Sequence, residues 1–185
     1  MNQEEVLALV LDTLDRCGVA FMVTGSFAGN LHGLPRATQD ADVVVEGEWL
    51  QLERFIAELG RDFYASRDAA HEALDCEGMF NVIHLETGFK VDLIVRKSRP
   101  FSREEFARRR VAGVGGRPRW FASPEDVILS KLEWSKLGNS ERQYLDALNV
   151  ARVQAGALDR AYLLRWADEL GVEHLLERLF SDLGA

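Results

Sequence analysis

The sequence has few cysteines, no long apolar run and no overall excess of basic charge. Two cysteines, Cys17 and Cys76, do not make a disulfide framework, and neither has other metal-ligating residues nearby in the sequence. We therefore predict that both are reduced thiols in a cytoplasmic protein. No apolar run approaches the roughly 20 residues that span a bilayer. The acidic start, Met1 to Glu5, lacks the basic and apolar pattern of a secretion signal. We therefore expect no membrane partner.

The net charge of −8 argues against a general affinity for nucleic acids, but the charge is unevenly distributed. Residues 96–119 hold nine arginine and lysine residues against Glu104 and Glu105, which gives this segment +7 and the rest of the chain −15. One interpretation is a basic patch that faces an anionic partner such as RNA. The other is a solvated helix with compensating acids elsewhere in the fold.

Apolar periodicity predicts an α/β portion followed by an all-helical portion. The expected strands cover 19–24, 41–45, 79–84, 89–95, 111–114 and 119–121, and the expected helices before residue 121 cover 3–16, 26–32, 48–59, 66–75 and 102–110. Ser26 is a plausible N-cap of the second of these helices, and Ser102 with Glu105 forms a capping box for the last.

The order of these elements sets the fold class. The turn Leu85-Glu86-Thr87-Gly88 joins two strands into a hairpin, which excludes a purely parallel sheet and predicts a mixed one. Four further helices are expected after Ser123-Pro124. The sequence therefore predicts an α/β core over 1–121 and a helical region over 122–185, packed with the core as one unit.

The chemistry is concentrated between the first two strands. The first strand runs into Gly25-Ser26, a short helix follows, and the chain returns as Asp40-Ala41-Asp42. Carboxylates at i and i+2 on a strand share one face, where a divalent metal commonly relieves their repulsion. The free N–H groups at Gly25-Ser26 suit a phosphate. Together these residues predict a site for a metal–nucleotide complex.

Three further residues extend this site. Asp92 lies inside the apolar strand 89–95, where a carboxylate is costly to bury unless it binds metal or a cation; the alternative is an aspartate that faces water or bonds to Lys90. Arg36 and Thr38 lie in the loop that leads to Asp40. Arg36 has the geometry to hold a phosphate, or it is a loop arginine in water.

Lys131 projects from the apolar face of its predicted helix, so it needs an anionic partner unless its head reaches the surface. A nucleotide phosphate or one of the aspartates would serve. Asp146 follows Arg142 by four residues on the next predicted helix, and the simplest account of Asp146 is an ion pair within that helix.

Gly25-Ser26, thirteen intervening residues and Asp40-Ala41-Asp42 resemble the signature of the nucleotidyltransferase (DNA polymerase beta-like) superfamily. The resemblance implies a mixed sheet with flanking helices, followed by a helical C-terminal region. It also implies that the Gly25-Ser26 turn holds the triphosphate of an NTP such as ATP. Asp40, Asp42 and a third carboxylate, Asp92, would hold two Mg²⁺ ions.

A narrower resemblance lies in the stretch from Ser123 to Leu132 together with Arg142 to Asp146, which is similar to the third and fourth motifs of AbiEii-type nucleotidyltransferases. That family includes toxins of toxin–antitoxin and phage-abortive systems. The resemblance covers roughly residues 19–150. It implies that Lys131 and Asp146 complete the active site and that an antitoxin protein is a partner.

The implied activity is Mg²⁺-dependent transfer of NMP from an NTP to a hydroxyl. A protein hydroxyl and a small-molecule hydroxyl are compatible acceptors, but the charge of segment 96–119 favours RNA, such as a tRNA 3′ end, over a cationic aminoglycoside. An aminoglycoside-type enzyme with a small-molecule acceptor is one alternative. A nucleotide-binding module without turnover is another.

Overall fold

The chain folds into two compact units, which the computed structural model describes over residues 1–114 and 116–184. Gly115 and Ala185, which belong to the predicted basic segment and helical region, lie outside the described residues. The sheet unit consists of Met1–Thr24 and Thr38–Phe121, and the helical unit consists of Gly25–Ala37 and Ala122–Ala185. The sequence predicted a single division at residue 121, whereas the contacts group 25–37 with the C-terminal helices.

The sheet unit contains a seven-stranded mixed sheet in the order β3-β4-β5-β2-β1-β7-β6. The central pairs β2·β5 and β1·β7 are parallel, and the remaining neighbours are antiparallel. The strands are β1 (Ala20–Thr24), β2 (Asp40–Glu46), β3 (Phe63–Ala65), β4 (Met79–His84), β5 (Lys90–Val95), β6 (Arg110–Val114) and β7 (Arg117–Phe121).

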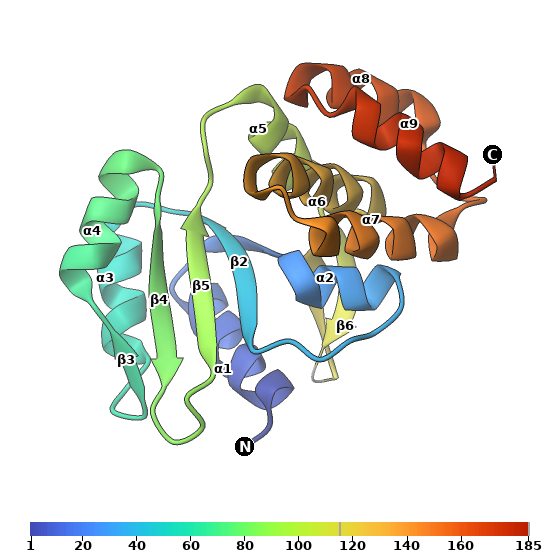
Figure 1. Cartoon of the computed structure of the whole chain (residues 1–185). Helices are drawn as coiled ribbons and strands as arrows, with labels where there is room; N and C mark the ends of the chain where they lie inside the picture. The colour runs from blue at the N-terminus through green and yellow to red at the C-terminus, as the bar shows by residue number, and fades with distance from the viewer. Residues whose placement is uncertain (115, 185) are drawn as a thin grey trace. The chain divides into compact units, whose positions relative to one another are not determined.

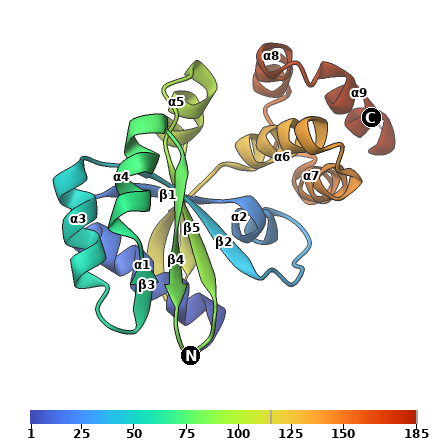
Figure 2. The same cartoon turned by 60° about the vertical axis from the view of Figure 1, so that its left-hand side comes forward.

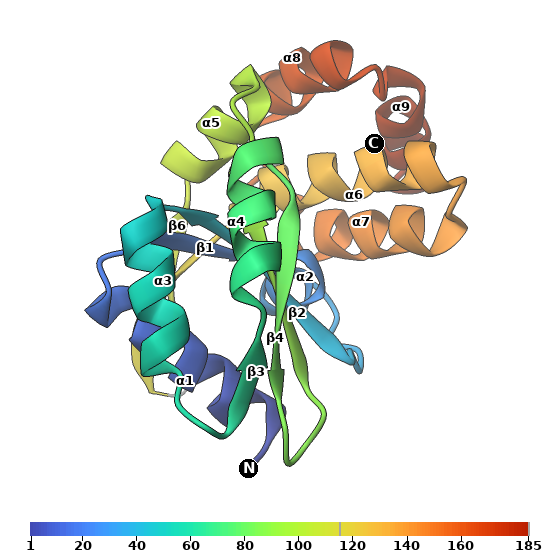
Figure 3. The same cartoon turned by 90° about the vertical axis from the view of Figure 1, so that its left-hand side faces the viewer.

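One face of this sheet is apolar and covered by helices. Phe21, Val43, Val91 and Phe80 alternate onto this face and are almost fully buried. The covering helices are α1 (Gln3–Arg16), α3 (Trp49–Glu58) and α4 (Arg67–Cys76), which lie together in Figures 1 and 3. Because side chains alternate, the intervening residues of the same strands carry the polar groups to the other face.

The helical unit is built around α6 (Pro124–Gly138), which is buried along most of its length. Ser123 caps this helix by accepting a hydrogen bond from the Asp126 backbone N–H. Around α6 pack α2 (Gly25–His32), α7 (Glu141–Gln154) and α8 (Arg160–Leu170), and α9 (Glu173–Asp182) packs against α7 and α8 (Figure 2). The contacts of α2 with α6 and α7 are the reason that residues 25–37 belong to this unit.

The predicted fold class, a mixed α/β sheet with flanking helices and a helical C-terminal region, is confirmed. Two local predictions were wrong, and one strand was missed. Helix α5 (Pro100–Ala107) begins before Ser102, with Arg99 at its N-cap, so Ser102 and Glu105 form no capping box. Helix α2 begins at Gly25, which places Ser26 inside its first turn rather than at its cap. Strand β3 was not predicted, because three residues are too few to show an alternating pattern. No described helix is long and apolar enough to cross a membrane.

The basic segment 96–119 is partly neutralised inside the sheet unit. Arg119, only 4% exposed, is bound by Asp12 and by Asp15 Oδ2, the latter at 2.9 Å. Arg117 also reaches Asp12, at 3.1 Å, and Arg96 pairs with Glu46. Burial opposes the ionisation of Asp12, but the bonds and charges of the two arginines outweigh it and lower its pKa. The local charge of the sequence is therefore not all available to a partner.

We expect Arg119→Met to lower the free energy of unfolding of the sheet unit by about 3 kcal/mol, because it leaves Asp12 without its buried partner between α1 and β7. Arg117→Met is the matched control: its side chain is 67% exposed, so its loss should cost less than about 1 kcal/mol. Urea unfolding of the two variants measures both values. Equal losses of unfolding free energy in the two variants would show that the ion pair of Arg119 with Asp12 does not hold α1 against β7.

Candidate functional site

Three carboxylates lie on the polar face of the sheet, on two adjoining strands. Asp40 and Asp42 are on β2, and Asp42 is directly opposite Asp92 of the parallel strand β5. Paired residues on neighbouring strands point to the same face, so the three side chains share it. Asp92 is buried, whereas Asp40 and Asp42 are partly exposed. Register thus brings together the residues that the sequence singled out for metal.

A lysine lies among these acids. Lys90 is opposite Asp40 in the β2·β5 register, and its Nζ is 2.8 Å from Asp92 Oδ2 and 4.0 Å from Asp40 Oδ2. The hydrogen bond to Asp92 raises the pKa of Lys90; burial works against this, and the charges of Asp92, Asp40 and Asp42 add to it. All three carboxylates therefore act on one ammonium group. The bond between Lys90 and Asp92 is the alternative that the sequence left open for Asp92.

Neighbouring polar groups orient the carboxylates. Asn81 of β4, opposite Asp92, donates its side-chain N–H to Asp92 Oδ1, so both oxygens of this buried carboxylate are occupied. Thr38 Oγ1 donates to the backbone oxygen of Asp40 at 3.0 Å and lies 3.3 Å from its Oδ1. The structure therefore places Thr38, a predicted nucleotide-binding residue, beside the first carboxylate.

The donors on this face suit a hard divalent cation, since all of them are carboxylate oxygens on one rigid sheet. Within residues 1–114 and 116–184, however, no three His, Cys, Asp or Glu side chains are gathered closely enough to hold a metal. Carboxylates repel one another, and here the Lys90 ammonium stands between Asp40 and Asp92. The residue types fit Mg²⁺, and the ammonium is the cation that the face already contains.

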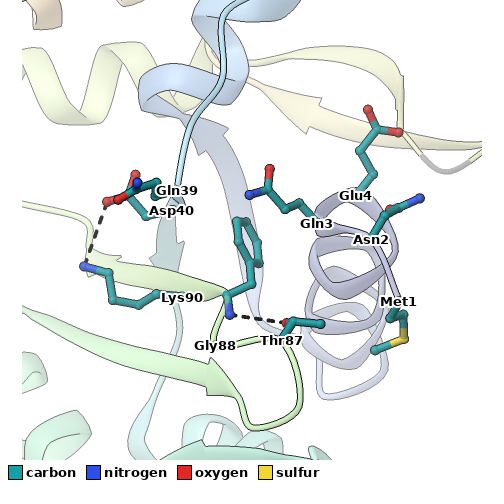
Figure 4. Close-up of a pocket in the computed structure, with 10 residues that line it drawn as sticks. Met1, Asn2, Gln3, Glu4, Gln39, Asp40, Thr87, Gly88 and Lys90 are labelled. Carbon is teal, nitrogen blue, oxygen red and sulfur yellow. Dashed lines mark hydrogen bonds and ion pairs between the residues drawn. The ribbon is translucent and has the colours of Figure 1, made fainter.

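A surface cavity of about 1080 Å³ opens beside this face, still within the sheet unit. Asp40, Gln39 and Lys90 line one side, and Gln3 and Asn2 from the start of α1 line another (Figure 4). The side chain of Lys90 borders both the carboxylates and open space.

The turn from β1 into α2 depends on glycine. Gly25 has φ +59°, a left-handed conformation that favours glycine over other residues. It opens α2 directly after Thr24, with Ser26 in the first turn. The Ser26 hydroxyl accepts a hydrogen bond of 3.0 Å from Arg36 Nη2. The loop that returns from α2 therefore folds back onto the turn.

In the helical unit, Asp146 joins two predicted site cations. Arg36 donates Nε and Nη2 to its two carboxylate oxygens at 2.9 and 2.7 Å, and Lys131 Nζ lies 3.1 Å from Oδ2. Burial opposes ionisation of Asp146, but its bonds to Arg36 and the charge of Lys131 outweigh it and lower its pKa. Lys131 is buried with an anionic partner, and the partners of Asp146 come from other elements rather than from Arg142. We call these three residues with Ser26 the cation cluster.

A small cavity of about 10 Å³ adjoins the cation cluster, bounded also by Asn30 and Asn149. This volume accommodates about one water molecule. A phosphate group is larger than this cavity, whereas the Arg36 side chain is 29% exposed and can be reached from solvent.

Sequence reasoning missed Asn81 and the pairing of Arg36 with Asp146. Asn81 could have been found from the hairpin, because its polar side chain interrupts β4 at the position facing Asp92. Arg36 and Asp146 are 110 residues apart in the chain, and no local pattern predicts such a pair.

Known structures share this fold over nearly the whole chain. An antigenic nucleotidyltransferase-like protein from Paracoccidioides brasiliensis gives a TM-score of 0.65 at 17% identity, covering 99% of this chain and 92% of that one. The antibiotic-resistance factor ANT(2″)-Ia in solution gives 0.58 at 15% identity, covering 98% and 95%. Its crystal structure with adenylyl-2″-tobramycin gives 0.58 at 17%, covering 98% and 99%. No family model and no curated protein matches the sequence. The chain therefore has a nucleotidyltransferase-type fold.

We expect Asp146→Asn to destabilise the helical unit by about 3 kcal/mol near neutral pH, because it leaves two cations without their shared anion. The folded pKa of Asp146 is below its unfolded value, so its contribution is present above about pH 4 and is lost as the pH falls through the folded pKa. The wild type should therefore lose stability more steeply than the variant below about pH 4. Thermal unfolding across this range measures the difference, and parallel pH profiles would contradict it.

Proposed function

We propose that this protein is a metal-dependent nucleotidyltransferase that moves NMP from an NTP to a hydroxyl acceptor. The observation that carries the proposal is the carboxylate face: Asp40, Asp42 and Asp92 lie on adjoining strands of a nucleotidyltransferase-type sheet, with the Lys90 ammonium among them. Three carboxylates gathered on one face are suited to a divalent cation.

In this proposal Asp40, Asp42 and Asp92 hold Mg²⁺, and the family resemblance implies two such ions. When bound, the metal neutralises the triphosphate and stabilises the charge that develops in the transition state. Thr38 and Asn81 keep Asp40 and Asp92 in place through the hydrogen bonds described above. A fixed sheet needs little reorganisation during reaction, which is how positioning contributes to the rate.

The reaction is an in-line displacement. The acceptor oxygen forms a bond to the α-phosphorus, the bond from that phosphorus to the bridging oxygen breaks, and pyrophosphate leaves with the bonding electrons. Asp92 assists removal of the acceptor proton. In this proposal Asp92 takes this role once the Lys90 ammonium, which is 2.8 Å from its Oδ2 in the structure, has moved away.

The charge of the cation cluster is the reason that we assign it to the phosphates of the NTP. Arg36 and Lys131 share the one carboxylate of Asp146, so the cluster has a net charge of +1 that a phosphate oxygen can offset. Gly25 and Ser26 add backbone N–H groups at the start of α2. Asp146 holds the two cations until a phosphate competes for them.

Among acceptors, we propose a small-molecule hydroxyl ahead of RNA. The chain has a net charge of −8, and Arg96, Arg117 and Arg119 of the basic segment are bound by acids of the same unit. This leaves less cationic surface for a polyanion than the sequence implied. A toxin role with an antitoxin partner, which the AbiEii resemblance implied, requires that expression of the chain alone arrests growth.

We expect Asp42→Asn to abolish transfer of label from an α-³²P NTP in the presence of Mg²⁺, because the variant loses a carboxylate ligand. The circular dichroism spectrum should stay unchanged, since Asp42 is only partly buried. Asp68→Asn, the same substitution at an exposed position on α4, is the control and should retain full transfer. Wild-type transfer by Asp42→Asn would remove Asp42 from the metal site. A wild type that binds NTP but transfers no label would favour a nucleotide-binding module.

For the acceptor, we expect label from an α-³²P NTP to enter the small-molecule fraction of a cell extract. The extract is separated into RNA, protein and small molecules before the protein is added to each fraction with Mg²⁺. The control is the protein carrying Asp42→Asn. Label recovered mainly in RNA would contradict the small-molecule assignment and support recognition through segment 96–119.

A further inference from the structure

An ammonium group of the chain itself, that of Lys90, lies among the carboxylates of the polar face. Lys90 Nζ is 2.8 Å from Asp92 Oδ2 and 4.0 Å from Asp40 Oδ2, and the charge of Asp42 also acts on it. Oxygens on two of the three acids thus face the same ammonium. A divalent ion that bound these acids would need the same oxygens.

We propose that Lys90 is a tethered counterion that competes with the divalent metal for Asp40, Asp42 and Asp92. This inference rests on the proposed function, because it takes these acids as metal ligands. The ammonium balances part of their charge when no metal is bound. It must leave Asp92 Oδ2 before a metal can use that oxygen.

Lys90 has room to move. Its side chain is 38% exposed, whereas that of Asp92 is 8% exposed. It also lines the cavity of about 1080 Å³ that opens beside Asp40 and Gln39 (Figure 4). A turn of the lysine side chain into this space frees the carboxylates without moving the sheet. Asn81 keeps Asp92 oriented through Oδ1 in either arrangement.

The consequence is a low affinity for free metal. A cation next to a carboxylate reduces its affinity for a proton by a factor of about 10 to 1000, and an incoming metal ion meets the same repulsion. A metal that arrives with a triphosphate brings anionic groups that can receive the displaced ammonium. Lys90 thereby favours the metal–nucleotide complex over the free ion.

The test is a Mn²⁺ titration without nucleotide, with free Mn²⁺ measured by electron paramagnetic resonance. We expect Lys90→Met and Lys90→Gln to bind Mn²⁺ at least about tenfold more tightly than the wild type. Lys90→Arg keeps the charge and should remain within about twofold of the wild type. Lys97→Met, at an exposed lysine just beyond β5, controls for the change in net charge and should also remain unchanged.

Thermal unfolding gives a second readout that does not depend on activity. Without metal, Lys90→Met should unfold at a lower temperature than the wild type because its carboxylates lose the Lys90 ammonium, and Mg²⁺ should raise its midpoint more than that of the wild type. Equal or weaker Mn²⁺ binding by both Lys90→Met and Lys90→Gln would overturn the inference. If the wild type still transfers NMP in that case, the proposed function stands and only the role of Lys90 fails. If the wild type and both variants fail to bind Mn²⁺ and the wild type also transfers no NMP, both the inference and the proposed function are overturned.

Discussion

Repulsion among carboxylates on one face of the sheet is the constraint on which the site depends. The apolar face of β2 and β5 must turn toward α1, α3 and α4, and alternation then sends Asp40, Asp42 and Asp92 to the other face. The β2·β5 register sets Asp42 beside Asp92, at the usual spacing of neighbouring strands. Core packing thus forces like charges together, and the chain supplies Lys90 as a partial counterion. In the proposed function, a divalent ion that displaces Lys90 would complete the compensation of this face.

The helical unit shows the opposite imbalance. There, Arg36 and Lys131 both bind Asp146, so two cations of the cation cluster meet the same carboxylate. We propose that the carboxylate face binds a cation and that the cation cluster binds a phosphate. The known structures establish the fold at low sequence identity. The assignment of chemistry depends instead on these two charge imbalances, because a fold by itself hosts many activities.

The basic segment shows why charge counted along a sequence differs from charge on a surface. The +7 of residues 96–119 suggested an anionic partner, but Arg119 is buried between Asp12 and Asp15, and Arg96 is paired with Glu46. Acids from α1 and β2, far away in the sequence, provide this compensation. An arginine within a strand can therefore hold neighbouring elements together through ion pairs rather than bind a ligand.

Local sequence patterns were enough to predict the mixed sheet, the helical C-terminal region and two carboxylates on one face of a strand. These features depend on local alternation, caps and turns, such as the alternating pattern of β2 and the hairpin at Leu85–Gly88. Which cation binds which acid could be read only from the folded chain. It selected Lys90 among the partners open to Asp92, joined Arg36 to Asp146 across 110 residues, and grouped α2 with α6 and α7. Such pairings depend on strand register and helix packing between distant segments, which no local sequence pattern specifies.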